Sequence, residues 1–108
     1  MANTFKSITK ASIGTSTQDV YTVPGATTTV VIGFCLSNRT GSNVTADVFI
    51  DKSTGDDVYI VKGILIPDGS LYDFNAGNKI ILQTGDKIQV TSSTASSVDV
   101  IVSVLEQT

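Results

Sequence analysis

Alternating valines near the end of the chain constrain its fold more than any other sequence feature. Every second residue there is a valine: Val98, Val100, Val102 and Val104. This period of two is that of a β-strand with one buried face. Ile101 and Leu105 place large apolar side chains on the opposite face as well. A strand that is apolar on both faces needs cover on both sides, from its own domain or from a partner chain, and this favours a protein that is built into an assembly.

The rest of the chain consists of short apolar segments separated by turn residues. The segments expected to form strands are 4–13, 18–23, 28–38, 44–51, 57–66, 71–74, 79–83, 86–92 and 97–106. The turn residues expected between them are Pro24, Gly25, Pro67, Gly69, Gly85 and Asp86, with a further turn at 75–78. Eight or nine strands at about ten-residue spacing predict an all-β, single-domain antiparallel β-sandwich, either a jelly roll or immunoglobulin-like.

Segment 28–38 is the most apolar of these and is expected to be a central strand. Its side chains predict one face made of Val30, Ile32, Phe34 and Leu36, and a second face with Val31 and Cys35. Gly33 in the middle favours a bulge or a close approach of two backbones. Residues 1–11 are expected to form an N-terminal arm or a strand, and residues 12–108 the sandwich itself.

Charge and hydropathy exclude several classes of partner. Only 16% of the 108 residues are charged, and the net charge is −3. The seven lysines and arginines are spread singly along the chain, which argues against nucleic-acid binding and against a basic membrane patch. The first residues lack the apolar stretch of a signal peptide, and no apolar run is long enough to span a bilayer. We therefore expect synthesis in a cytoplasm.

The residue types needed for catalysis are scarce. The chain has no histidine, which removes the commonest general base and the commonest metal ligand. Cys35 is the only cysteine, so no intrachain disulfide can form, and a small buried apolar residue is its expected role. The carboxylates lie mostly in expected turns, and no tryptophan is present to line a sugar cleft. We expect no catalytic residues, no metal site and no cofactor.

Two short patterns leave alternatives open. Residues 51–57, DKSTGDD, resemble a calcium loop, but the glutamate that an EF-hand requires is missing, so a hairpin turn is favoured over a surface calcium site. Asn38 and Asn43 each begin a glycosylation sequon, which carries little weight without a secretory signal.

Four segments together resemble a known family. They are SIGTSTQDVYTVPGATTTVVIGFCLSN, DVYIVKGILIPDGSL, KIILQTGDKIQV and SVDVIVSVLEQT, and they cover the chain from about Ser12 onward. In order and spacing they resemble small virion structural proteins of tailed bacteriophages, above all of contractile-tailed phages of marine bacteria, cyanobacterial hosts included. The resemblance implies a small β-sandwich without enzymatic activity that is present in many copies on the virion.

These observations lead to one functional expectation and one alternative. The first is a structural protein that decorates or cements a phage capsid, or is attached to its neck or tail, with other virion proteins as partners. A homo-oligomer is expected, with a trimer as the favoured unit, and the expected interface residues are Phe5, Ile8, Ile101 and Leu105. The alternative is a host-receptor or glycan-binding module at the tip of a tail fibre or baseplate. A calcium-dependent adhesive domain is a third, weaker option.

Overall fold

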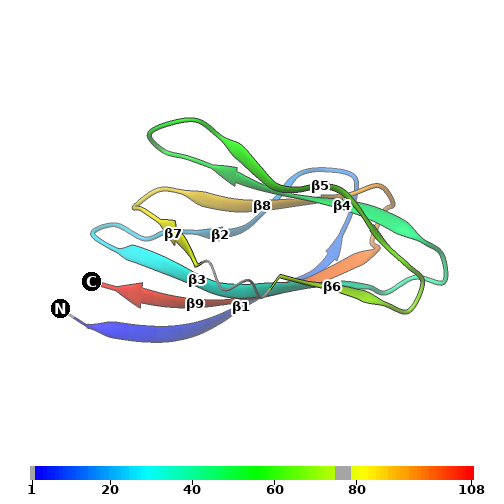
Figure 1. The fold of residues 1–108 in the computed structure, drawn as a ribbon, viewed down its shortest axis with the longest axis horizontal. Coiled ribbons are helices and arrows are strands. Elements are labelled where there is room, and N and C mark those ends of the chain that lie inside the picture. The colour runs from blue at the N-terminus through cyan, green and yellow to red at the C-terminus, as the bar shows by residue number, and fades with distance from the viewer. Residues whose placement is uncertain (1, 75–78) are drawn as a thin grey trace.

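The chain folds into two antiparallel β-sheets that pack face to face. The structure is a computed structural model that describes residues 2–74 and 79–108, and in this part of the chain there are nine strands and no helix. The strands are β1 (Asn3–Ile13), β2 (Gln18–Thr22), β3 (Thr28–Asn38), β4 (Val44–Asp51), β5 (Val58–Ile66), β6 (Leu71–Phe74), β7 (Ile80–Leu82), β8 (Lys87–Ser92) and β9 (Val98–Gln107). The predicted all-β sandwich is confirmed (Figure 1).

The strand pairing follows a nested pattern. Sheet A has the order β1-β9-β3-β6, with β7 also paired to β3, and sheet B has the order β2-β8-β4-β5. Strand β4 pairs with β5, β3 with β6 and β7, β2 with β8, and β1 with β9. The whole chain is thus one long hairpin rolled into two layers, which is the arrangement of a jelly roll and not of an immunoglobulin domain.

The hydrophobic core lies between the two sheets. All four alternating valines of β9 are buried, as the period of two predicts. Sheet A adds Val31, Phe34 and Leu36 from β3, and sheet B adds alternate residues of β4 and β8, namely Val44, Ala46, Val48, Ile50, Ile88 and Val90. The core side chains are mostly β-branched, which suits a pleated surface buried on one side.

A bulge in β3 changes the faces that alternation alone predicts. The pairing of β3 with β9 shifts between Val31 and Gly33, so one extra residue is accommodated there. Before the bulge Val31 points into the core, and after it Phe34 does, while Val30 and Ile32 are only partly buried. The assignment of Val30 and Ile32 to the face of Phe34 was therefore wrong, because a bulge reverses the alternation.

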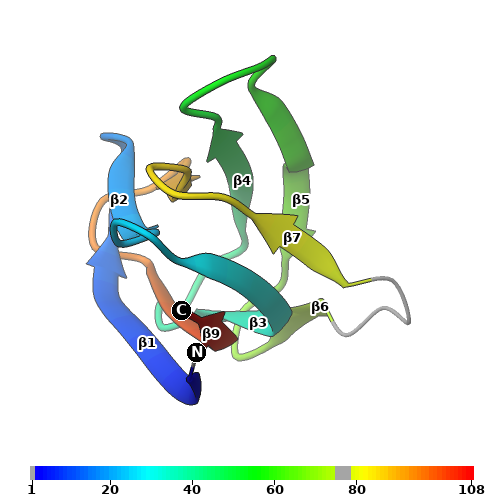
Figure 2. The ribbon, with the colours of Figure 1, turned by 90° about the vertical axis from the view of Figure 1, so that its left-hand side faces the viewer.

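The first strand forms one edge of sheet A. Strand β1 pairs with β9 along nearly its whole length, so residues 3–13 lie beside β9 and not across its outer surface. The ladder continues to the ends of the chain, where Thr108 N–H donates to Ala2 O at 2.9 Å. The molecule measures 45 × 24 × 22 Å, and both ends of the chain lie together at one tip (Figures 1 and 2). The expected turn at 75–78 lies outside the described residues.

Proline and glycine residues shape two of the turns. After Pro24, residues Gly25 and Ala26 turn the chain from β2 to β3, and Ala26 rather than the glycine adopts a positive φ of 53°. In the turn that starts at Pro67, Gly69 has a φ of 67°, and the fourth residue donates its N–H to the Pro67 carbonyl at 3.0 Å. A positive φ at the third position defines a type II turn, which glycine forms without strain.

Candidate functional site

An apolar row crosses the outer face of sheet A. In the register of the strands, Phe5 of β1 is opposite Leu105 of β9, Leu105 is opposite Val30 of β3, and Val30 is opposite Ile81 of β7. All four side chains point away from the core: Leu105, Val30 and Ile81 alternate with buried neighbours, and Phe5 is opposite Leu105 in the register. We call these four residues the apolar row. Adjacent strands lie about 4.8 Å apart, so the row spans roughly 14 Å.

The apolar row is open to solvent. The residues Phe5 and Ile81 at its two ends are 75% and 54% exposed, and Val30 and Leu105 between them are partly buried. Ile101, two outward positions further along β9, is 45% exposed. The alternative that an N-terminal arm of this chain covers Ile101 and Leu105 does not apply, since β1 lies beside β9 in the sheet. Contiguous exposed apolar surface on a soluble domain marks an interaction site more often than isolated residues do.

The four residues expected at an interface fall on two different faces. The structure brings Phe5, Ile101 and Leu105 together on the outer face of sheet A. Ile8 is opposite the buried Val102 and packs, half-buried, against the core. The sequence reasoning did not include Val30 and Ile81. Only the register of β3 and β7 places them in the row, although the exposure of Ile81 follows from its alternation with the core residue Leu82.

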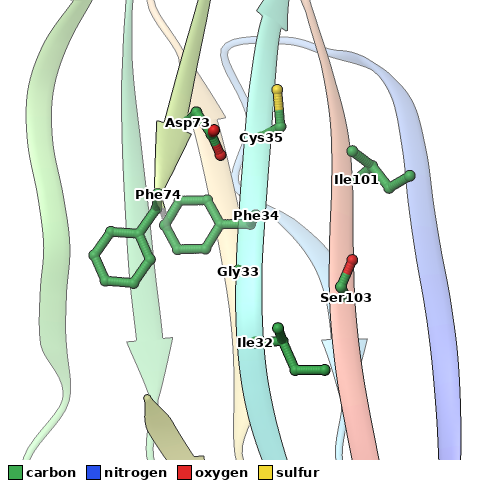
Figure 3. A pocket seen from close by; sticks show the side chains of 8 residues that line it. All are labelled: Ile32, Gly33, Phe34, Cys35, Asp73, Phe74, Ile101 and Ser103. Carbon is green, nitrogen blue, oxygen red and sulfur yellow. The ribbon is translucent and has the colours of Figure 1, made fainter. Parts of the chain in front are cut away.

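A hollow of about 200 Å³ lies on the same face next to the bulge of β3 (Figure 3). We call it the sheet A hollow. Its lining residues are Ile32, Gly33, Phe34, Cys35, Asp73, Phe74, Ile101 and Ser103. The rings of Phe34 and Phe74 are stacked with centroids 4.8 Å apart. Gly33 has no side chain, and the bulge displaces its neighbours, which accounts for the recess at this place on the sheet.

Cys35 lines this hollow but is poorly suited to covalent chemistry. It is half-buried on the outer side of β3, and not in the core where a buried apolar role would have placed it. Burial, and then the nearby charge of Asp73, raises the pKa of the Cys35 thiol. A raised pKa keeps the thiol protonated at neutral pH, whereas the thiolate is the nucleophilic form.

The outer face of sheet B has a different character. Lys62 pairs with Asp47 at 3.6 Å, Lys87 pairs with Asp19 at 3.5 Å, and Gln89 donates to Asp19 at 2.7 Å. The hydrogen bond from Gln89, followed by the charge of Lys87, lowers the pKa of Asp19. These side chains are solvated and paired, so this part of the face is polar and carries both signs of charge, while Tyr59 and Leu65 are exposed on the edge strand β5.

A second hollow of about 210 Å³ lies on this polar face, and we call it the sheet B hollow. Its lining residues are Thr17, Asp47, Phe49, Tyr59, Gln89 and Thr91. Phe49 and Tyr59 meet edge to face at 5.0 Å, and the ammonium of Lys62 lies 4.7 Å from the centre of the Tyr59 ring. The hollow therefore combines an aromatic wall with carboxylate, amide and hydroxyl groups.

A buried carboxylate ties the two sheets together. Glu106 of β9 accepts a hydrogen bond from the Tyr21 hydroxyl at 2.5 Å and pairs with Lys6 at 2.9 Å. Tyr21 also shares a hydrogen bond with Thr29 at 2.8 Å. Burial, followed by Glu106, raises the pKa of Tyr21 to about 12, and the Tyr21 hydrogen bond lowers the pKa of Glu106. Because Glu106 is enclosed and its oxygens are satisfied, this cluster is structural.

The turn at Gly85 contains a second buried carboxylate. Asp86 is fully buried, accepts from the backbone N–H groups of Ser53 and Gln83 at 2.9 Å each, and pairs with Lys52 at 2.5 Å. Burial alone raises the pKa of Asp86, but these donors outweigh it and lower the pKa to about 2. Gly85 has a φ of 88°, and a side chain there would approach Ser53 within 3.0 Å. Asp86 thus joins two loops.

The two short sequence patterns have structural explanations. In the loop 51–57, the Asp57 carboxylate accepts from the Lys52 N–H at 2.8 Å, which closes the turn from within. Among the described residues, no group of three or more acidic, histidine or cysteine side chains could hold a metal ion. Asn38 is buried, and its amide nitrogen donates to three backbone carbonyls at 2.7 to 3.2 Å, so this nitrogen is inaccessible to a glycosyl group.

Comparison of the chain with protein-family models, with curated proteins and with solved structures finds no match. Within the described residues, no helix exists that is long and apolar enough to cross a membrane. The candidate sites are therefore the two outer faces: the sheet A face with its apolar row and hollow, and the sheet B face with its polar hollow.

Proposed function

We propose that this protein is a non-enzymatic structural component of a tailed-bacteriophage virion, where it decorates or cements the capsid or is attached to the neck or tail. The observation that carries the proposal is the open apolar row on sheet A, which is built from strands at both ends of the chain. The resemblance of four ordered sequence segments to small virion proteins supports the same assignment. Its partners are other virion proteins and further copies of the chain, and its location is the virion.

The proposed mechanism is passive adhesion. Burying apolar surface contributes about 25 cal/mol per Å², before the cost of association is subtracted. One such face gives a weak contact by itself, but many copies arrayed on one particle bind with avidity.

The test is to purify particles of the phage that carries this gene and to quantify the chain in them with isotope-labelled peptide standards. We expect the chain to sediment with the particles, in many copies for a decoration protein and in few for a neck protein. Ile101→Asp should abolish incorporation, and Leu65→Asp, at a similarly exposed position on sheet B, should leave it unchanged. A chain that stays in the soluble fraction while the particles form would overturn the proposal.

A specific observation favours a second function, the binding of host-surface glycans. The sheet B hollow places the Tyr59 and Phe49 rings beside Asp47 and Gln89. An apolar ring wall with a few convergent polar groups is the usual composition of a small-ligand site. A glycan array with purified protein tests it: saturable binding that Tyr59→Ala abolishes and Phe5→Ala preserves would favour the glycan-binding module. An array without saturable binding would exclude it.

A further inference from the structure

We propose that the sheet A face binds the same face of a second copy of this chain, with Phe5 of each copy seated in the sheet A hollow of the other. Phe5 is the most exposed large apolar residue in the described chain, and the hollow lies on the same outer face. The inference rests on the proposed structural role of this face and names the partner that covers it.

The size of the hollow fits an aromatic ring. Cavities of about 150 Å³ lined by leucine, isoleucine and phenylalanine hold a benzene molecule. The sheet A hollow measures about 200 Å³ and has the outward side chains of Ile32 and Ile101 in its lining. Phe34 and Phe74 also line it, although Phe34 is 5% exposed and both rings pack against the core. A ring that enters it contacts apolar walls on several sides, which is the arrangement of the aromatic anchors that dominate binding energy in interfaces.

The charge distribution on the face permits contact with itself. The outward residues of β1, β9 and β3 around the apolar row and the hollow are uncharged as far as Asp99, which pairs with Arg39 at 3.2 Å. Asp73 is the one carboxylate in the hollow lining, and it is exposed at the rim. A chain with net charge −3 repels its copies in general, so a face with few charges is where two copies can meet.

The register of the strands fixes the symmetry of the pair. The hollow lies roughly 10 Å from Phe5 across the strands and roughly 10 Å along them, from strand spacing and residue rise. If each Phe5 fills the other hollow, a two-fold axis must lie in the plane of the face, midway between the two positions. The strands of the two copies then cross at about 90°, which is one of the two angles at which sheets pack.

The expected affinity of the two copies for each other follows from the surface area that the pair buries. Crossed sheets overlap over about 20 Å in each direction, so the pair buries less than about 1,200 Å² in total, at the small end of specific interfaces. We therefore expect a dissociation constant on the order of micromolar. This two-fold pair takes the place of the trimer as the expected unit, since an isologous face closes after two copies.

Sedimentation equilibrium of the purified protein tests the pair. With rising concentration the mass should increase from 11.3 kDa to twice this value. Phe5→Asp should weaken the association at least tenfold, whereas the control Leu65→Asp, 56% exposed on sheet B, should leave it unchanged. A wild-type monomer at about millimolar concentration, a limiting mass of three chains, or an unaffected Phe5→Asp variant would each overturn the inference.

A crosslinking experiment tests the docking itself. Cys35 lines the hollow and is the only native thiol, so Phe5→Cys should be joined to Cys35 of a second copy by a short bismaleimide. Within one chain the two positions are two strands and four residues apart, roughly 16 Å, beyond the reach of such a linker. A covalent dimer should form, and it should be lost in the double variant that also carries Cys35→Ser. An equal yield in the double variant would refute the docking.

These outcomes are separate from those of the virion proposal, because purified protein alone is measured. A dimer of a chain that is absent from particles would leave the pairing intact and remove the virion role. A chain that is incorporated into particles but stays monomeric in solution, with no crosslink, would support the virion role and refute the pairing.

Discussion

The two sheets contribute equally to one core, yet their outer faces differ in kind. Sheet A presents a row of apolar side chains with a hollow beside it, and sheet B presents paired charges around an aromatic edge. Both faces obey the same alternation, so burial of the core does not determine what the outward residues are. The inward residues of both sheets serve one core, whereas the outward residues are free to serve contacts with a partner. The substitutions below separate an effect on stability from an effect on association.

Substitution by aspartate should affect the free energy of unfolding very differently at two neighbouring residues of β9. Val102→Asp puts an unpaired charge into the core and should cost about 4 kcal/mol or more, which is most of the stability of a domain of this size. Ile101→Asp points outward and should cost less than about 1 kcal/mol while it removes association. Circular dichroism with urea denaturation measures both. An Ile101→Asp chain that fails to fold would show that this face is internal.

The buried pair of Asp86 and Lys52 should have the next largest effect. Asp86 has a folded pKa of about 2, below its ordinary value of 3.8, so its contribution is fully present above about pH 4 and is lost as the pH falls toward 2. The shift corresponds to about 2 kcal/mol. Asp86→Asn should lose about this much at pH 7 and should show a weaker dependence on pH below 4. Urea denaturation at several pH values measures the difference, and equal pH profiles would contradict it.

The hydrogen bond between Glu106 and Tyr21, which links the two sheets, should contribute less to the free energy of unfolding. Removal of one hydrogen bond to a buried charged group costs about 1 to 2 kcal/mol, and Glu106→Gln keeps one acceptor for the Tyr21 hydroxyl. A double-mutant cycle with Tyr21→Phe should give a coupling of about 1 kcal/mol, since the two side chains are in direct contact. Additive effects of the two substitutions would mean that the negative charge of Glu106 adds nothing to this hydrogen bond, because the glutamine still accepts from the Tyr21 hydroxyl.

The ion pairs on the sheet B face should matter least for folding. Lys87→Ala removes an exposed pair with Asp19 and should change the free energy of unfolding by less than about 0.5 kcal/mol. The small effect should shrink further at high salt, because exposed charges are screened. Urea denaturation at low and high ionic strength gives both values. A loss above about 1 kcal/mol would mean that this face stabilises the fold and does not only solvate it.

The local sequence pattern predicts where the strands lie but not which strands pair with one another. The alternating valines of β9 and the turn chemistry at Gly69 and Asp86 depend on residues close in sequence, so they could be predicted from it. The apolar row joins residues from both ends and the middle of the chain, and only the long-range register brings them together. The bulge that Gly33 predicts is confirmed, but it also reverses the faces of half a strand, which a simple period of two does not include.

The nested pairing of the strands favours one order in which they can pair during folding. Among the described strands, only β4 and β5 both follow one another in the chain and pair with each other, and each outer pair brings together segments that the inner pair has already drawn close. Folding from the inside outward would avoid one large loop closure, so we expect the terminal pair β1–β9 to close last. This pair carries Phe5 and Leu105, so the apolar row on the outer face of sheet A is complete only once β1 and β9 have paired. A partly folded chain has no complete face with which to capture another copy.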